Sequence, residues 1–107
     1  MRIIAIGTLR DYWIKCPDAE RALRAWIGEV LAAQWTSPAD VKAQFRNASV
    51  LPNRRVVFNI KGNDYRLVVA IAYAFGAVYI KFVGTHAEYD AIRAQMVEHK
   101  SAKESKT

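Results

Sequence analysis

Apolar side chains in the first part of the chain recur at the spacing of an amphipathic helix. Between residues 18 and 33 they fall three and four positions apart and form one stripe, which consists of Leu23, Trp26, Ile27, Val30 and Leu31. Charged residues lie off this stripe, so one side of the segment is apolar and the other is polar. The pattern predicts a helix over residues 18–33 with Trp26 in the protein core.

Two shorter helices are predicted from the residues at their beginnings. Thr8 followed by Asp11 matches a capping box, in which two side chains bind the first backbone amides of a helix. Ser37 before Pro38 repeats the signal, because serine is a favoured N-cap and proline fits the first helical position. We therefore expect helices over residues 8–16 and 37–45, after a short strand over residues 2–6.

The pattern changes to strands after residue 47. Segments rich in valine, isoleucine and aromatic residues, separated by short turns, cover residues 49–51, 55–60, 65–73 and 78–83. Consecutive strands joined by short turns pair in antiparallel fashion, because parallel pairing needs a long crossover. Val56, Phe58 and Ile60 form a wholly apolar face and are expected to point at the helices.

Together these elements predict an α+β fold. We expect an N-terminal strand and two to three helices packed on one face of a twisted antiparallel sheet, followed by a short C-terminal helix. At 107 residues and 52% hydrophobic composition, the chain is long enough for one domain, which we assign to residues 1–92. Apolar content falls after residue 91, so residues 93–107 are expected to be a helix end and a disordered tail.

Strand alternation assigns polar side chains to the other, open face of the sheet. The expected members of this face are Arg55, Val57, Asn59, Lys61, Arg66, Tyr79, Lys81 and Val83. Ile80 and Phe82 are expected on the opposite face, toward the helices. Because Arg66 lies on the middle strand, it could share the open face with Lys61 and Lys81.

The net charge of +6 is concentrated on the predicted sheet. Residues 42–81 hold seven lysines and arginines and only Asp64 as an anion, whereas the charges of the two flanking segments cancel. Such a basic stripe attracts nucleic acid or an acidic protein. The alternative is a solvated basic face that binds no ligand.

Composition restricts the remaining classes of site. The single cysteine, Cys16, permits no internal disulfide and no cysteine-based zinc site, and its helical spacing predicts a buried structural role. Neither a metal-ligand cluster nor a phosphate-binding glycine loop is evident, so we expect no cofactor. The N-terminal residues match neither a signal peptide nor a membrane span, so the expected location is the cytoplasm.

A further helix start follows the last strand, and it contains two residues that can transfer a proton. Thr85 and Glu88 fit a capping box, which explains both residues structurally. His86 then lies in the first helical turn, and Tyr89 lies beside it three residues later. A histidine in this place can exchange a proton near neutral pH. Taken singly, an exposed histidine is more often inert and a tyrosine more often packs, but both lie beside the basic face.

These groups suit the metal-free cleavage of RNA. The ribose 2′-hydroxyl attacks the adjacent phosphorus, and the reaction needs a base, an acid and fixed cations. His86 could be the acid or the base, Arg66 and Lys81 could bind the scissile phosphate, and Tyr89 could stack on a base or donate a proton. The residues expected to hold the flanking RNA are Arg55, Asn59, Lys61 and Asn63.

Two sequence blocks resemble the HigB family of bacterial type II toxins, within the RelE/ParE superfamily. They are FN-x-KGN-x-YR, which contains Arg66, and THAEYD, which contains His86 and Tyr89. The resemblance covers about residues 1–92 and implies a RelE-like fold, ribosome-dependent cleavage of mRNA, and a HigA-type antitoxin with a helix-turn-helix domain. Lys81 takes a place that this family often gives to arginine, which keeps the charge and loses the bidentate phosphate contact.

A second class of function stays open at this point. The ParE branch of the same superfamily shares the fold and inhibits gyrase, and fold alone does not separate the two activities. The alternative function is therefore a noncatalytic interaction module: a ParE-like gyrase inhibitor, or an inactive homologue that binds RNA or an acidic partner.

Overall fold

Helices and strands follow the predicted order in the computed structural model, which describes residues 1–92 and, for the backbone alone, 100–101. The helices are α1 (Gly7–Lys15), α2 (Glu20–Ala32), α3 (Pro38–Gln44) and α4 (His86–Asp90), with short 3₁₀ turns η1 (Pro17–Ala19) and η2 (Tyr73–Phe75). The strands are β1 (Arg2–Ile4), β2 (Ser49–Leu51), β3 (Arg55–Ile60), β4 (Tyr65–Ala72), β5 (Ala77–Thr85) and β6 (Lys100–Ser101). The α+β class predicted from the sequence is confirmed.

The sheet has the order β1-β5-β4-β3-β2, and β6 also pairs with β5. Strands β2 to β5 are antiparallel, as their short connections predicted. However, β1 pairs with β5 in parallel, so the sheet is mixed and not wholly antiparallel. The helices and strands between β1 and β5 supply the long crossover that parallel pairing requires.

The main core lies between the sheet and helices α1 and α2. Val56, Phe58 and Ile60 are buried on the helix side of β3, as predicted, and the Trp26 ring lies 5.4 Å from the Phe58 ring. Leu31, the last member of the predicted stripe, is 54% exposed. At 3.6 residues per turn it is rotated by about 80° from Leu23, which takes it off the buried face.

Two of the predicted helix starts differ in detail from the structure. Helix α1 begins at Gly7, so Thr8 lies inside its first turn and the predicted capping box with Asp11 is wrong. The chain instead turns at Ala5, whose φ is 69° and whose carbonyl accepts a hydrogen bond from the Thr8 amide. Ser37 does precede α3, but the carboxylate of Asp40 is the group that binds the adjacent Thr36 amide at 2.7 Å.

A β-bulge in β5 reverses part of the predicted alternation. Val68 pairs with Phe82 while Val69 pairs with Ile80, so Lys81 is one extra residue between the two pairs. Because side chains alternate with a period of two, an extra residue exchanges the faces beyond it. Phe82 therefore lies on the face away from α1 and α2, and Val83 packs on the helix side, which is the reverse of the prediction.

The predicted helix end and tail over residues 93–107 lie outside the described residues, except that residues 100 and 101 form β6. Cys16, expected to be buried, is half-buried against the helix-side core. Of the helices within the described residues, none has the length and apolar character needed to span a membrane.

Candidate functional site

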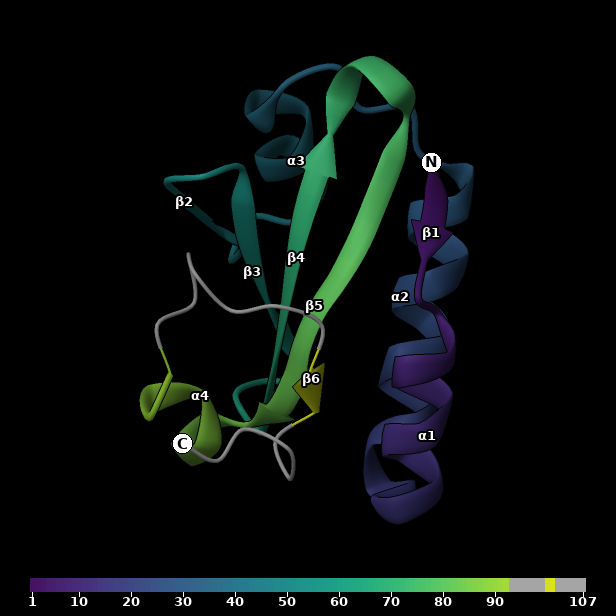
Figure 1. The fold of residues 1–107 in the computed structure, drawn as a ribbon, viewed down its shortest axis with the longest axis vertical. Helices are drawn as coiled ribbons and strands as arrows, with labels where there is room; N and C mark the ends of the chain where they lie inside the picture. The colour runs from purple at the N-terminus through teal and green to yellow at the C-terminus, as the bar shows by residue number, and fades with distance from the viewer. Residues whose placement is uncertain (93–99, 102–107) are drawn as a thin grey trace.

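The open face is the surface of the sheet that α1 and α2 leave uncovered, and α4 lies beside it. Figure 1 shows α1 and α2 along one side of the molecule, with α4 on the other side at the end of β5. The middle of this face is apolar, because Val57, Val68 and Phe82 are buried there and Tyr89 and Ile92 pack against them. Its polar groups lie at the two ends of the strands.

The capping box that begins α4 is confirmed. The Glu88 amide donates to the Thr85 hydroxyl oxygen at 3.1 Å, and the Thr85 amide donates to the Glu88 carboxylate at 2.8 Å. The His86 amide donates to the carbonyl of Asp64 in the β3–β4 turn at 3.2 Å. These bonds fix the backbone on both sides of His86 and tie it to the hairpin.

The imidazole of His86 has an acidic partner within its own helix. Its Nδ1 lies 3.1 Å from the carboxylate of Asp90, and both side chains are at least half exposed. A carboxylate at this distance favours the tautomer with the proton on Nδ1, which leaves Nε2 to exchange a proton with a substrate. The sequence pattern did not select Asp90 as a site residue, although its spacing of four residues from His86 is the signal that could have done so.

Arg66 lies at the same end of the open face as His86. On β4 it pairs with Gly84 of β5 and Asn59 of β3. Its guanidinium donates to the carbonyl oxygens of Asn63 and Tyr65, each at 3.3 Å. We define the His86 cluster as Asn59, Asn63, Arg66, His86 and Asp90; the structure thus brings together four of the predicted site residues and adds Asp90.

Lys61, also predicted on the open face, points to the helical layer. Its φ of 55° breaks the strand alternation, and its Nζ lies 2.9 Å from the carboxylate of Asp18 in η1. The Tyr65 hydroxyl donates to the same carboxylate at 3.3 Å. The hydrogen bond from Lys61 lowers the pKa of Asp18, and the same bond raises the pKa of Lys61. Lys61 therefore joins the hairpin to η1, and the prediction that its side chain lies on the open face is wrong.

The other predicted cations lie at the opposite end of the open face. Arg55 and Lys81 line a hollow of about 360 Å³, which we call the arginine hollow; its polar and aromatic residues are Asn53, Arg54, Arg55, Phe75, Tyr79 and Lys81. Arg55 is only 4% exposed, so only a small part of this residue reaches the surface of the hollow. The Lys81 Nζ lies 5.8 Å from the centre of the Tyr79 ring.

The predicted catalytic residues therefore do not lie together: His86 and Arg66 lie at one end of the open face and Lys81 at the other. Lys81 precedes Gly84, the partner of Arg66, by three residues along β5, which corresponds to roughly 10 Å. Tyr89 packs against the apolar middle of the face, between the two ends, as the packing interpretation expected. The sequence did not select Arg54 for the site, because its place in the hollow depends on a turn that strand alternation does not describe.

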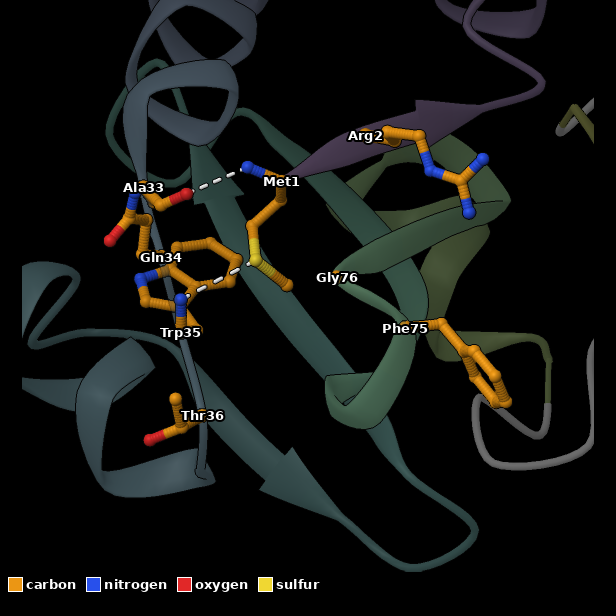
Figure 2. A pocket seen from close by; sticks show the side chains of 8 residues that line it. All are labelled: Met1, Arg2, Ala33, Gln34, Trp35, Thr36, Phe75 and Gly76. Atoms are coloured by element: carbon orange, nitrogen blue, oxygen red, sulfur yellow. Dashed lines mark hydrogen bonds between the residues drawn. The ribbon is translucent and has the colours of Figure 1, made fainter.

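A second hollow, of about 540 Å³, is lined by none of the predicted site residues and shares Phe75 with the arginine hollow. Figure 2 shows Met1 and Trp35 within it, with hydrogen bonds from the Met1 ammonium to the Ala33 carbonyl at 2.7 Å and from the Trp35 amide to the Met1 sulfur at 3.4 Å. The ring of Phe75 points away from both. Among the described residues, no three His, Cys, Asp or Glu side chains gather closely enough to bind a metal ion.

Comparison with known proteins gives the same family as the two sequence blocks. The chain is 29% identical over 96 residues to the mRNA interferase toxin HigB of Escherichia coli K12, an alignment that covers 88% of this chain and 92% of that protein. The same values hold for the mRNA interferase HigB of Shigella flexneri. Another mRNA interferase HigB, from E. coli O6:H1, is 24% identical over 102 residues, which are 94% of this chain and 99% of that protein.

The family match covers all of the residues that form the His86 cluster and the arginine hollow. A sequence model of the HigB toxins, described as the RelE-like toxic component of a toxin-antitoxin system, matches residues 19–92. This range includes strands β2 to β5 and helix α4, and with them the His86 cluster and the arginine hollow. The chain belongs to the HigB toxin family.

Proposed function

We propose that this toxin is an endoribonuclease that cleaves mRNA on the ribosome without a metal ion. The observation that carries the proposal is the placement of His86, held by Asp90 at 3.1 Å, at the same end of the open face as Arg66. A proton-transfer group beside a fixed cation is what phosphodiester cleavage by the ribose hydroxyl needs. The names of the relatives, mRNA interferases, support the same activity.

The reaction begins with attack of the ribose 2′-oxygen on the adjacent phosphorus. As that bond forms, the bond from phosphorus to the 5′-oxygen breaks, which leaves a 2′,3′-cyclic phosphate and a 5′-hydroxyl. A base takes the proton of the 2′-hydroxyl, and an acid gives a proton to the departing 5′-oxygen. We assign one of these transfers to Nε2 of His86, and we assign stabilisation of the charge on phosphorus to Arg66.

The other expected residues have supporting roles in this proposal. Asn59 and Asn63, at the His86 end of the face, hold the RNA backbone beside the scissile phosphate. Lys81 and Arg55 contribute positive charge at the arginine hollow. To Tyr89, which packs between the two ends, we assign stacking on a base or donation of a proton through its hydroxyl.

The proposal includes the partners and the location of the toxin. A family defined by a toxin-antitoxin system implies an antitoxin, for which we propose a HigA-type protein with a helix-turn-helix domain. The ribosome is proposed as the place where the mRNA is presented, and the cytoplasm as the compartment. The basic open face suits a negatively charged RNA surface.

Mapping transcript ends after expression tests the proposal. Wild type and a His86→Ala, Lys81→Ala double variant are induced, and new 5′ ends are compared. Lys15→Ala is the matched control, because it removes the same charge from the exposed surface of α1. We expect new ends with wild type and the control and none with the double variant. Equal cleavage by all three contradicts the site, and intact transcripts with DNA damage indicate a gyrase inhibitor instead.

A further inference from the structure

The arginine hollow is a formed site remote from the proton transfer and the phosphate contact that we assign to His86 and Arg66. It lies at the end of the open face remote from His86, where Arg55 pairs with Ala70 and Ala70 with Tyr79 across three strands. Along β3, Arg55 is four residues from Asn59 of the His86 cluster, which corresponds to roughly 13 Å. The two sites therefore share one face and the same three strands.

The backbone holds Arg54 firmly at the edge of this hollow. Asn53 and Arg54 have φ angles of 63° and 58°, in the left-handed region that residues with a side chain rarely adopt. The Arg54 carbonyl accepts a hydrogen bond from the Ile71 amide at 3.0 Å, which ties the turn to β4. The exposed side chain of Arg54 therefore extends from a turn whose backbone is hydrogen-bonded to β4.

The side chains around the hollow combine positive charge with aromatic rings. Arg54, Arg55 and Lys81 line it, and none of its lining residues is an aspartate or glutamate. Phe75, in η2, is 76% exposed, and Tyr79 is 37% exposed. Cations that bind phosphate next to rings on which bases stack are the usual components of a single-stranded nucleic-acid site.

We infer that the arginine hollow binds a nucleotide that flanks the scissile one, with its phosphate at Arg54 and its base against Phe75. This inference rests on the proposed function and extends it to a second RNA subsite. An RNA strand that joins the two subsites passes over Tyr89, whose packing between them provides a further stacking surface. An acidic segment of an antitoxin is the competing occupant, but charge complementarity alone does not account for the exposed ring of Phe75.

Binding of a cleavage-resistant RNA tests the inference. The probe is a short, fluorescently labelled single-stranded RNA with 2′-O-methyl groups, which lack the attacking hydroxyl, and its dissociation constant is measured over a range of salt concentrations. Arg54→Gln is expected to weaken binding about fivefold, the effect of one exposed phosphate contact. It should also reduce the slope of log affinity against log salt by about 0.7.

Two further variants separate the base contact from the phosphate contact. Phe75→Ala is expected to weaken binding of the base-containing RNA and to leave an abasic version of the same strand unaffected, because only the base stacks. Arg21→Gln removes one exposed cation from α2, on the helix side of the molecule, and controls for net charge. The inference requires that Arg21→Gln retain the wild-type affinity and salt slope.

The outcomes distinguish this inference from the proposed function. If wild type cleaves ribosome-bound mRNA but Arg54→Gln binds RNA like Arg21→Gln, the arginine hollow is not an RNA subsite. If Arg54→Gln instead weakens binding of the cognate antitoxin and leaves RNA affinity unchanged, the hollow binds protein and the inference is overturned. If wild type binds the probe through Arg54 but leaves mRNA intact, the subsite stands and the cleavage proposal fails.

Discussion

Among single residues, the proposed cleavage depends most on the pairing of His86 with Asp90. Neither side chain is buried, so the carboxylate acts mainly by orienting the ring and selecting its tautomer. The sequence pattern placed His86 correctly at the start of a helix but did not include Asp90 among the site residues. The i, i+4 contact became meaningful only once α4 was known to lie beside Arg66.

Replacing the two members of this pair should slow cleavage to different extents. His86→Gln removes the proton-transfer group and is expected to lower kcat by about 10²- to 10⁴-fold. Asp90→Asn keeps the ring and is expected to lower kcat by a smaller factor, with KM unchanged, because binding does not use this carboxylate. Single-turnover cleavage of ribosome-bound mRNA measures both. An Asp90→Asn variant with the wild-type rate would show that the carboxylate does not act on His86.

Arg66 should tolerate lysine poorly. Lysine keeps the positive charge but loses the planar fork that binds phosphate through two parallel hydrogen bonds. We expect Arg66→Ala to abolish most cleavage and Arg66→Lys to restore only part of it, whereas circular dichroism of both variants stays unchanged. Full activity of Arg66→Lys would indicate that a point charge is enough at this position.

At the scale of elements, short local motifs set the positions of the chemical groups. The capping box of α4 places His86, and it was readable from the sequence because its two bonds lie within four residues. The bulge at Lys81 was not readable, since it depends on the register between β4 and β5. Without it, Phe82 would lie against the helices and the open face would lose one of its three buried apolar residues.

Loss of the capping box should detach α4 from its position. Thr85→Ala removes the side-chain acceptor of the N-cap and is expected to cost about 1 kcal/mol of unfolding free energy. Cleavage should fall as well, because His86 begins the helix that Thr85 caps. Thr85→Ser retains the hydroxyl and serves as the control. Urea denaturation and cleavage assays on both variants test this; equal losses for alanine and serine would assign the effect to the threonine methyl group.

The link between the hairpin and η1 should depend on pH. The pKa of Asp18 is lowered in the folded protein by its hydrogen bond from Lys61, so the pair stabilises the fold above the ordinary carboxyl pKa of about 4 and this contribution is lost as pH falls further. We expect Asp18→Asn to be less stable than wild type at neutral pH, with the difference shrinking below about pH 4. A difference in unfolding free energy that is constant with pH would contradict the charge interaction.

Across the whole molecule, the sequence predicted which helices and strands form the two layers better than it predicted the pairing of the N-terminal strand and the direction of individual side chains. Helical and strand periodicity identified the antiparallel strands β2 to β5 and the helix-side core, because both follow from local pattern. The parallel pairing of β1 with β5, the turn of Lys61 toward Asp18 and the burial of Arg55 depend on contacts between distant segments. The predicted site residues are therefore divided between the two ends of the open face, with Tyr89 between them and Lys61 on the helix side.

Product analysis on ribosome-bound mRNA tests directly whether the toxin cleaves RNA through the ribose 2′-hydroxyl. Purified toxin is mixed with ribosomes that carry a defined message, and the fragment ends are identified for wild type and His86→Gln. We expect a 2′,3′-cyclic phosphate and a 5′-hydroxyl with wild type, no cleavage at a site whose 2′-hydroxyl is replaced by hydrogen, and a rate at least about 10²-fold lower with His86→Gln. Cleavage of the 2′-deoxy message, or an unchanged rate with His86→Gln, would contradict this mechanism.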